Sequence, residues 1–239
     1  MRPRAIIWDV DDTIFDYRGA DLAGMRAHLL TEGLLGGDDS AERALGRWQR
    51  ITVRHWARFS AGETDFQGQR RDRVRTFTGR AGMTDAEADA WFGRYIVHYE
   101  AAWSLFPDTV PALDRLSGYR HAVLSNSSAE VQEHKLRTLG VRDRFEAVVC
   151  AAELGVSKPA AEAFHTACAA VGLRPGEVVY VGDEPDIDAR GAVEAGLRGI
   201  WLDRTGRGGR PELIRITGLD QLPGLLAGDT RFGAPSTFG

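Results

Sequence analysis

The chain has 239 residues, of which 43% are hydrophobic and 27% are charged, the composition of an ordinary globular protein. This length accommodates one large α/β domain, or a core with a smaller second domain. The formal net charge of −4 gives no electrostatic basis for binding nucleic acid or a membrane surface. No apolar run is long enough to span a membrane, and the first predicted strand begins so early that no room is left for a signal peptide. We therefore expect a cytoplasmic protein.

The first predicted strand, centred on residues 6–8, is an apolar run that leads directly into the sequence Asp9-Val10-Asp11-Asp12-Thr13. An apolar run of this kind is typical of a central parallel strand, and open α/β sheets bind ligands just past the carboxyl ends of such strands. On an extended backbone the side chains of Asp9 and Asp11 would point the same way. Two neighbouring carboxylates need a shared proton or a divalent metal. The alternative is a turn with a helix N-cap, because Asp and Thr serve both.

Residues 16 to 103 differ from the rest of the chain because they contain several amphipathic helices and no convincing buried strand. A capping box at residues 84–87 opens the last of these helices, and the aromatic residues that follow it recur at helical spacing, which is typical of core packing. The predicted helices cover residues 17–32, 40–60, 65 to about 77, and 84–99. This segment is therefore predicted to be a helical domain inserted after the first strand.

From residue 105 onward, predicted strands and helices alternate. Strands separated by single helices imply right-handed crossovers and a parallel, doubly wound sheet. The predicted strands cover residues 121–125, 145–151, 178–182 and 198–202, and helices begin near residues 108, 127, 159 and 187. The predicted fold class is α/β, with a Rossmann-like core at residues 1–15 and 104–230, the inserted helical domain at 16–103, and a frayed tail at 231–239.

Further polar residues follow the later strands, where this fold would gather them at one edge of the sheet. Ser125 and Asn126 lie between a strand and a capped helix, a place that suits an anion but also describes a plain capped helix. Lys158 precedes another helix, where a lysine opposes the helix dipole and favours a neighbouring anion; a solvated surface charge is the alternative. Asp183 and Asp188 belong to a group of four acidic residues within six positions, more than helix capping explains.

The predicted sheet edge would thus combine carboxylates with a lysine and a hydroxyl. Carboxylate oxygens with no histidine or cysteine beside them fit Mg²⁺ rather than zinc. A metal together with a lysine, a hydroxyl and backbone donors fits a phosphate group, and a second carboxylate beside a nucleophile fits general acid–base work. The residues therefore predict phosphoryl chemistry.

These motifs resemble those of the haloacid dehalogenase superfamily of phosphohydrolases, and the resemblance covers the whole chain. The pattern D-x-D-x-T is matched by residues 9–13, the second motif by Ser125, the third by Lys158-Pro159, and the fourth by Asp183 with Asp188. The helical segment at 16–103 lies where subfamily I members carry an α-helical C1-type cap, which closes over the site and excludes water. One departure is Asp12, where many members have glycine, although aspartate also occurs there in nucleotidase- and sugar-phosphatase-like branches.

The resemblance implies the reaction and the residues that carry it. A small phosphorylated metabolite would be hydrolysed, with Asp9 as the nucleophile that forms an aspartyl-phosphate and Asp11 as the general acid/base. Mg²⁺ would be held by the Asp9 carboxylate, the Asp11 backbone carbonyl and Asp183. Asp188 would orient the lysine or a metal-bound water. The residues expected to bind the phosphoryl group are Thr13, Ser125, Asn126 and Lys158.

Several alternatives stay open at this point. Sugar phosphomutases share every motif named above, and a non-catalytic phosphate-binding member is a further possibility, although every catalytic position is filled. Asp11 argues against a true dehalogenase, which lacks the second acid. A receiver-type signalling domain would be about half this length and would have no inserted helical segment. The sequence is compatible with a monomer or a homodimer.

Two groups of basic residues in the helical segment could contact an anionic part of the substrate. We expect both groups to be solvated helix faces instead. The first comprises Arg54, His55 and Arg58, and the second comprises Arg70, Arg71 and Arg73.

Overall fold

The computed structural model describes residues 2–35 and 41–228, so the predicted tail at 231–239 lies outside the described residues. The chain divides into two compact units. Unit 1 consists of the described part of residues 1–15 and 105–239, and unit 2 consists of the described part of residues 16–104.

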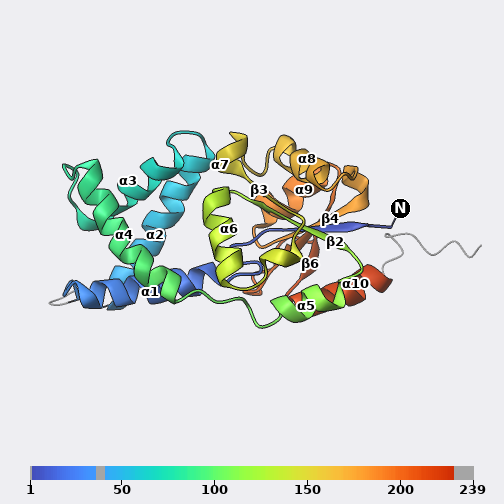
Figure 1. Ribbon diagram of the computed structural model, residues 1–239, viewed down its shortest axis with the longest axis horizontal. Helices are drawn as coiled ribbons and strands as arrows, with labels where there is room; N and C mark the ends of the chain where they lie inside the picture. Colours follow the sequence, from blue (N-terminus) through green and yellow to red (C-terminus); the bar gives the residue numbers. More distant parts are fainter. Residues whose placement is uncertain (1, 36–40, 229–239) are drawn as a thin grey trace, which may run out of the picture. The chain divides into compact units, whose positions relative to one another are not determined.

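Unit 1 is built on a six-stranded sheet in which every paired strand is parallel, with the order β3-β2-β1-β4-β5-β6 (Figure 1). The predicted α/β class with a doubly wound parallel sheet is therefore confirmed. The strands are β1 (Ala5–Trp8), β2 (Arg120–Ser125), β3 (Ala147–Cys150), β4 (Val178–Gly182), β5 (Arg198–Leu202) and β6 (Ile214–Ile216).

Strand β1 occupies the centre of the sheet because all four of its residues are buried and apolar. It pairs with β2 on one side and with β4 on the other, and Trp8 lies opposite both Val123 and Val181. The three strands therefore end at the same edge of the sheet. That register brings the residues that follow them, beginning with Asp9 and Asp183, to one place.

Helices cover both faces of this sheet, and Figure 1 shows α8 and α9 above the strands and α5 and α10 below them. One face of β1, β2 and β4 packs on α8 through a core that includes Ile7, Leu124, Phe164 and Tyr180. The helices of unit 1 are α5 (Thr109–Arg115), α6 (Ala129–Thr138), α7 (Ala151–Leu154), α8 (Ala161–Ala170), α9 (Gly191–Glu194) and α10 (Leu222–Gly228).

Some elements of unit 1 were not predicted. The three-residue strand β6 and the four-residue helix α7 are too short to show a hydrophobic period. Helix α10 directly follows a 3₁₀ turn at Leu219–Gln221 and contains Pro223. The helix predicted near residue 187 is a π-helix at Pro185–Arg190 that continues directly into α9. Its proline and closely spaced acids gave no signal for that unusual winding.

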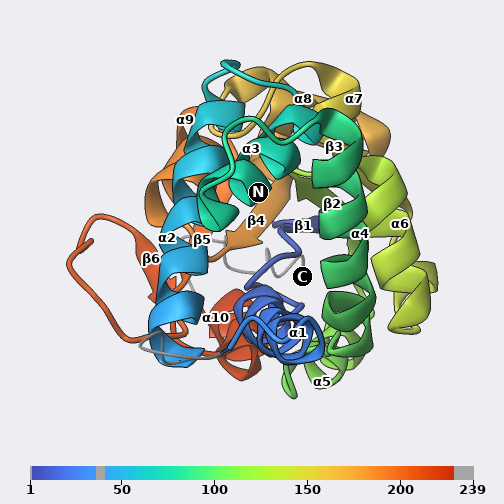
Figure 2. The same cartoon turned by 90° about the vertical axis from the view of Figure 1, so that its left-hand side faces the viewer.

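In its described residues, unit 2 contains four helices and no strand: α1 (Tyr17–Thr31), α2 (Ala41–Ser60), α3 (Phe66–Thr78) and α4 (Asp85–Ala101). Helix α4 packs along α1, and α3 packs against both α2 and α4; Figure 2 views α1 end-on, with α2 and α4 upright. The predicted capping box is present, because Thr84 accepts from the Glu87 N–H and the Glu87 carboxylate accepts from the Thr84 N–H. The predicted aromatic stripe is buried in the core.

A buried acid lies inside unit 2. Asp21 accepts hydrogen bonds from Trp48 Nε1 at 2.9 Å and from the Tyr95 hydroxyl at 2.6 Å, and the guanidinium of Arg73 lies 3.7 Å away. This network gives hydrogen-bond partners to the Trp48 N–H and the Tyr95 hydroxyl, which would otherwise be buried in the aromatic core without a partner.

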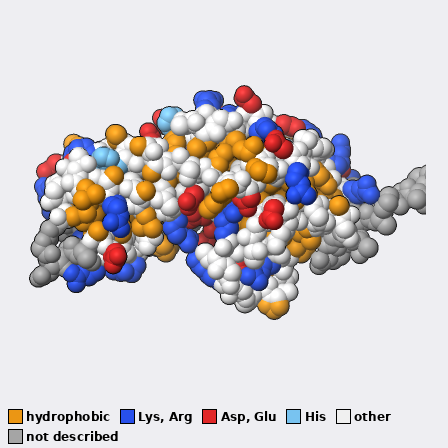
Figure 3. Space-filling model, turned by 90° about the horizontal axis from the view of Figure 1, so that it is seen from below, with side chains coloured by type: hydrophobic (Ala, Val, Ile, Leu, Met, Phe, Trp, Pro, Cys, Tyr) orange, Lys and Arg blue, Asp and Glu red, His pale blue; other side chains and the backbone are white. Residues whose placement is uncertain are grey.

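The surface drawn in Figure 3 mixes Lys and Arg side chains with Asp and Glu side chains instead of gathering one sign of charge. Among the described residues, no helix has both the length and the apolar character that crossing a membrane requires.

Candidate active site

The centre of the candidate site is Lys158, which follows α7 in a loop and is only 3% exposed. Its ammonium group donates to Asp9 Oδ1 at 2.7 Å, to Asp188 Oδ1 at 2.7 Å and to the Tyr180 hydroxyl at 2.8 Å. Burial alone would lower the pKa of Lys158, but Asp188 and Asp9 raise it well above its usual value. The lysine is therefore a fixed buried cation, and the alternative of a solvated surface charge is excluded.

Three acids surround this cation. Carboxylate oxygens of Asp9, Asp183 and Asp188 all lie within 4.8 Å of one another. Burial, opposed by Lys158 and reinforced by the charges of Asp188 and Asp11, raises the pKa of Asp9 to about 7. Burial and the nearby carboxylates also raise the pKa of Asp183 well above its usual value. One lysine thus does not balance the negative charge of the cluster.

An excess of buried carboxylate oxygens is what a hard divalent cation requires. No histidine or cysteine belongs to the cluster, which comes from the described residues. The donor set therefore fits Mg²⁺, through Asp9 and Asp183. Asp188 also belongs to the cluster, but one of its oxygens already accepts from Lys158 and the other accepts from the Glu184 N–H at 3.0 Å.

The loop after β1 fixes the orientation of Asp9. The Val10 carbonyl accepts from the backbone N–H groups of Thr13, Ile14 and Phe15, which closes a tight turn. The buried hydroxyl of Thr13 donates to Asp9 Oδ2 at 3.3 Å, so both oxygens of Asp9 are hydrogen-bonded. The acidic sequence thus forms a turn, as the plainer interpretation held, and the same turn holds the carboxylate in the cluster.

Within this turn, Asp12 has a φ of 58°, which makes it the one non-glycine residue with positive φ in the described chain. Aspartate tolerates this left-handed conformation better than most residues, and glycine adopts it freely. The conformation explains why an aspartate can stand where many relatives of this fold have glycine.

The side chain of Asn126 fixes the Lys158 loop. Its amide group donates to the Lys158 carbonyl at 3.0 Å, and its carbonyl accepts from the Lys158 N–H at 2.8 Å. The neighbouring Ser125 is buried at the end of β2, where its hydroxyl accepts from the Ser127 N–H at 3.3 Å and from Gln132 Nε2 at 3.0 Å. Both residues lie at the sheet edge, but the Asn126 side chain contacts protein backbone there.

Asp11 does not join the acidic cluster through its carboxylate. One oxygen accepts from the ammonium group of Lys135, and the other accepts from Gln132 Nε2 at 2.7 Å. The expectation that Asp9 and Asp11 point the same way assumed an extended backbone, whereas β1 ends at Trp8 and the chain then turns. The metal contact expected of Asp11 uses its backbone carbonyl, and it stays a prediction.

Three residues at the site were not singled out in the sequence: Gln132, Lys135 and Tyr180. A weak signal existed for each. Gln132 and Lys135 are three positions apart, so they share one face of a helix, and both are buried. Tyr180 places a hydroxyl inside an otherwise apolar buried strand, where it needs a polar partner.

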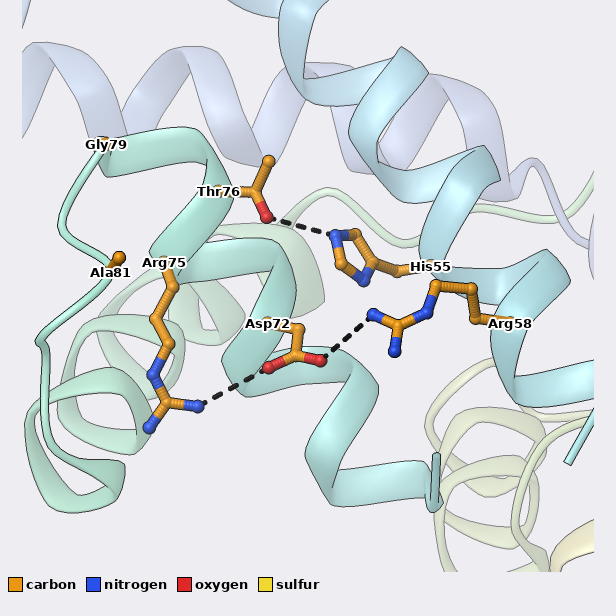
Figure 4. A pocket seen from close by; sticks show the side chains of 7 residues that line it. All are labelled: His55, Arg58, Asp72, Arg75, Thr76, Gly79 and Ala81. Atoms are coloured by element: carbon orange, nitrogen blue, oxygen red, sulfur yellow. Dashed lines mark hydrogen bonds and ion pairs between the residues drawn. The ribbon is translucent and has the colours of Figure 1, made fainter. Parts of the chain in front are cut away.

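Unit 2 contains a cavity of about 380 Å³ between α2 and α3 (Figure 4). Asp72 accepts from Arg58 at 3.3 Å and from Arg75 at 3.5 Å, so the charged groups that line the cavity pair with one another. His55 is 4% exposed, and its Nε2 lies 3.1 Å from the Thr76 hydroxyl. The expectation of a solvated face is therefore wrong for His55, because its ring packs between the two helices.

The second basic group of unit 2 is also only partly solvated. Arg71 pairs with Asp85 and Asp89, as a surface residue would. Arg73 is 3% exposed and lies over the Trp48 ring, and the half-buried Arg70 stacks on aromatic rings of the same unit. The expectation of a solvated face is wrong for Arg73, because its guanidinium is enclosed by the aromatic core.

Comparisons with known proteins bear on the family and the fold of the chain. A family model described as haloacid dehalogenase-like hydrolase matches residues 3–196. A phosphoserine phosphatase of Thermus thermophilus is 36% identical over 131 residues, which are 54% of this chain and 49% of that protein. A ribulose-1,5-bisphosphate 5-phosphatase of Halopiger xanaduensis is 29% identical over 206 residues, covering 83% of this chain and 84% of that protein.

A similar fold occurs in a solved structure of a magnesium-bound HAD-hydrolase, YfnB from Bacillus subtilis. The TM-score is 0.79 at 21% sequence identity, and the alignment covers 95% of this chain and 99% of that one. At this identity the likeness concerns the fold alone.

Proposed function

Because the chain belongs to the family of haloacid dehalogenase-like hydrolases, we propose that it is a Mg²⁺-dependent phosphatase acting on the phosphate monoester of a small metabolite. The observation that carries this proposal is the position of the Asp9 carboxylate inside an acidic cluster. Lys158 donates a hydrogen bond to one of its oxygens, and Thr13 donates to the other. A carboxylate held in this way suits nucleophilic attack on phosphorus. Similar proteins are named phosphoserine phosphatase and ribulose-1,5-bisphosphate 5-phosphatase, which supports the reaction class.

Asp9 and Asp183 would hold the metal, together with the Asp11 backbone carbonyl. When bound, Mg²⁺ would supply positive charge that offsets the charge on the phosphoryl oxygens and keeps the nearby carboxylates ionised. The raised pKa of Asp9 supports this role, because a protonated carboxyl group is a poor nucleophile and a nearby positive charge would keep it ionised. Asp188 would orient Lys158, with which it shares a 2.7 Å hydrogen bond.

In the first half-reaction, a carboxylate oxygen of Asp9 attacks phosphorus, and the bond between phosphorus and the ester oxygen breaks. Asp11, which must carry a proton when the ester binds, gives that proton to the departing oxygen, so the alcohol leaves in neutral form. The products of this step are the free alcohol, an aspartyl-phosphate on Asp9 and an ionised Asp11.

In the second half-reaction, Asp11 takes a proton from a water molecule whose oxygen attacks the phosphorus of the aspartyl-phosphate. The bond between Asp9 and phosphorus breaks, inorganic phosphate is released, and both aspartates return to their starting state.

The phosphoryl group would be bound by the Lys158 ammonium and by the hydroxyls of Thr13 and Ser125. Asn126 has both side-chain polar atoms on the Lys158 backbone, so it would serve the phosphate by holding the lysine loop and by its own backbone N–H. Lys158 would then neutralise phosphoryl charge that develops in the transition state.

Unit 2 would be the α-helical C1-type cap, and its residues would select the substrate. We further propose a cytoplasmic protein that acts as a monomer or a homodimer on a small metabolite. A sugar phosphomutase would use the same residues, but it would transfer the phosphoryl group to a second sugar position instead of to water.

The test is a panel of phosphate monoesters assayed for released inorganic phosphate, with Mg²⁺ and with excess EDTA. We expect Mg²⁺-dependent release for at least one ester, and a loss of at least about 10³-fold in kcat for Asp9→Asn. Asp114→Asn is the matched control, since Asp114 is exposed on α5 and its carboxylate pairs with Arg144 at the surface.

No turnover of any ester would refute the phosphatase function, and full turnover in EDTA would refute the metal requirement. Turnover that survives in Asp9→Asn would show that another residue is the nucleophile. Isomerisation of a sugar phosphate without release of phosphate would establish a mutase instead.

A further inference from the structure

Helix α6 presents two buried polar side chains to Asp11. Gln132 and Lys135 are 0% and 1% exposed, although both types are rarely buried in folded proteins. The Lys135 ammonium donates to Asp11 Oδ1 and lies 4.2 Å from the centre of the Phe15 ring. Gln132 Nε2 donates to Asp11 Oδ2 at 2.7 Å. Both oxygens of the Asp11 carboxylate are therefore held, one by a cation and one by an amide.

This arrangement is not explained by stability. Removing an ammonium group from water costs several kcal/mol, and a buried ion pair is often no more stable than a well-packed apolar pair of the same volume. Asp11 itself is partly open, with 31% of its side chain exposed, whereas Lys135 has 2% of its side chain exposed. The buried ammonium of Lys135 contacts the partly exposed carboxylate of Asp11. A functional role at that carboxylate explains this contact better than stability does.

Gln132 also connects the two halves of the site. The same Nε2 that donates to Asp11 donates to the Ser125 hydroxyl at 3.0 Å. Its Oε1 is buried with no hydrogen-bond partner among the described residues. Through its Nε2, the amide therefore links the hydroxyl of Ser125, proposed to bind phosphate, with the carboxylate of Asp11, proposed to transfer the proton.

We propose that Lys135 and Gln132 form a two-point clamp that positions the Asp11 carboxyl group for proton transfer to the leaving alcohol. The inference rests on the proposed phosphatase function, in which the proton of Asp11 moves to the ester oxygen as the bond between that oxygen and phosphorus breaks. Both clamp residues act through Asp11 and not on the substrate, so both are positioning residues. The position of a proton donor governs the rate only where the leaving group needs the proton.

That dependence on the leaving group provides the test. A 4-nitrophenolate ion leaves without help, whereas an alkoxide such as that of glycerol phosphate needs a proton as the bond breaks. The ratio kcat/KM reports every step up to the release of the alcohol, and it excludes the later hydrolysis of the aspartyl-phosphate. We therefore compare kcat/KM for 4-nitrophenyl phosphate and glycerol phosphate in full-length protein with Mg²⁺.

For Lys135→Met, which keeps the apolar stem beside Phe15 but removes the ammonium group, we expect kcat/KM for glycerol phosphate to fall by about 10- to 100-fold. The same constant for 4-nitrophenyl phosphate should change less than about threefold, since that leaving group needs no proton. Gln132→Met should show a smaller loss in the same direction. Arg137→Met is the matched control, because Arg137 lies on the same helix, is 68% exposed in its side chain and pairs with Glu133. It should leave both constants unchanged.

Equal losses for both esters would overturn the proposal, because they would indicate a general structural or binding role. Faster turnover of glycerol phosphate in Lys135→Met would also overturn it, by showing that the clamp restrains Asp11 away from the leaving group. If Lys135→Met does not fold, Gln132→Met alone decides between these outcomes. A wild-type protein that hydrolyses neither ester, nor any other in the panel, would mean that the proposed function itself fails; a failed clamp instead leaves wild-type turnover intact.

Discussion

His28 makes unit 2 sensitive to acid. Its ring is 0% exposed and packs edge-to-face on Trp91 at 4.5 Å between ring centres. Neither ring nitrogen has a hydrogen-bond partner among the described residues. Burial is the main cause that lowers the pKa of His28 from 6.5 to about 4; the nearby charge of Glu32 raises it, and those of Arg94 and His98 lower it. The ring is therefore neutral in the folded protein at neutral pH.

The effect on stability follows from proton linkage. The unfolded chain takes up a proton at His28 as the pH falls below about 6.5, whereas the folded protein does so only near pH 4. The contribution is thus fully present above pH 6.5 and is lost as the pH falls toward 4. At pH 5 the loss is about 2 kcal/mol, and screening by solvent at the partly exposed Glu32–Arg94 pair reduces it to about 1–2 kcal/mol.

Urea unfolding of the wild type and of His28→Phe at pH 7 and pH 5 measures this loss. We expect the free energy of unfolding of the wild type to fall by about 1–2 kcal/mol more than that of the variant, which cannot take up the proton. His134→Gln, which removes an exposed histidine on α6, should behave like the wild type. The same pH dependence in His28→Phe as in the wild type would refute the reasoning, as would an NMR titration that places the His28 pKa near 6.5.

Two further substitutions test packing and the site. Tyr180→Phe removes the hydroxyl that contacts Lys158 at 2.8 Å and Asp188 at 3.1 Å. We expect the free energy of unfolding in urea to fall by about 1–2 kcal/mol and kcat to fall several-fold. An unchanged kcat would show that Asp9 and Asp188 alone suffice to hold the lysine. Gly24→Ala places a Cβ 2.5 Å from the Tyr99 Cα where α1 crosses α4. We expect the melting temperature to fall by several degrees, which corresponds to a loss of about 1–3 kcal/mol in the free energy of unfolding. An unchanged melting temperature would show that the two helices can move apart without loss of stability.

The sequence predicted the fold class well because the elements that determine it are long or strongly apolar. Strand β1 is buried on both faces, and helices of ten residues or more show their period clearly. The elements that were missed are short. Strand β6 has only three residues and pairs at the sheet edge, where no hydrophobic run is needed. The π-helix at Pro185–Arg190 was read as part of an ordinary helix because its winding depends on the loop it closes.

The candidate site was predictable where residues follow strand ends. Parallel pairing brings those ends to one edge, so Asp9, Lys158 and Asp183 could be placed together before any distance was known. The contacts of Gln132 and Lys135 could not be predicted in this way. Both residues lie on the buried face of α6. A polar residue on such a face interrupts the apolar period of the helix, and the sequence alone does not reveal which partner it has.

The two lysines explain how two acids so close in sequence can do different work. Asp9 and Asp11 would repel each other if they shared one environment, and one of them would then be held neutral. The turn that follows β1 gives them different partners: Asp9 faces Lys158 in the acidic cluster, whereas Asp11 faces Lys135 on α6. Each acid therefore has its own buried cation on its own segment of the chain. In the proposed mechanism, Asp9 would then be charged together with the metal site, while a different segment would set the orientation of Asp11. A substitution at either lysine should therefore impair one task without removing the other.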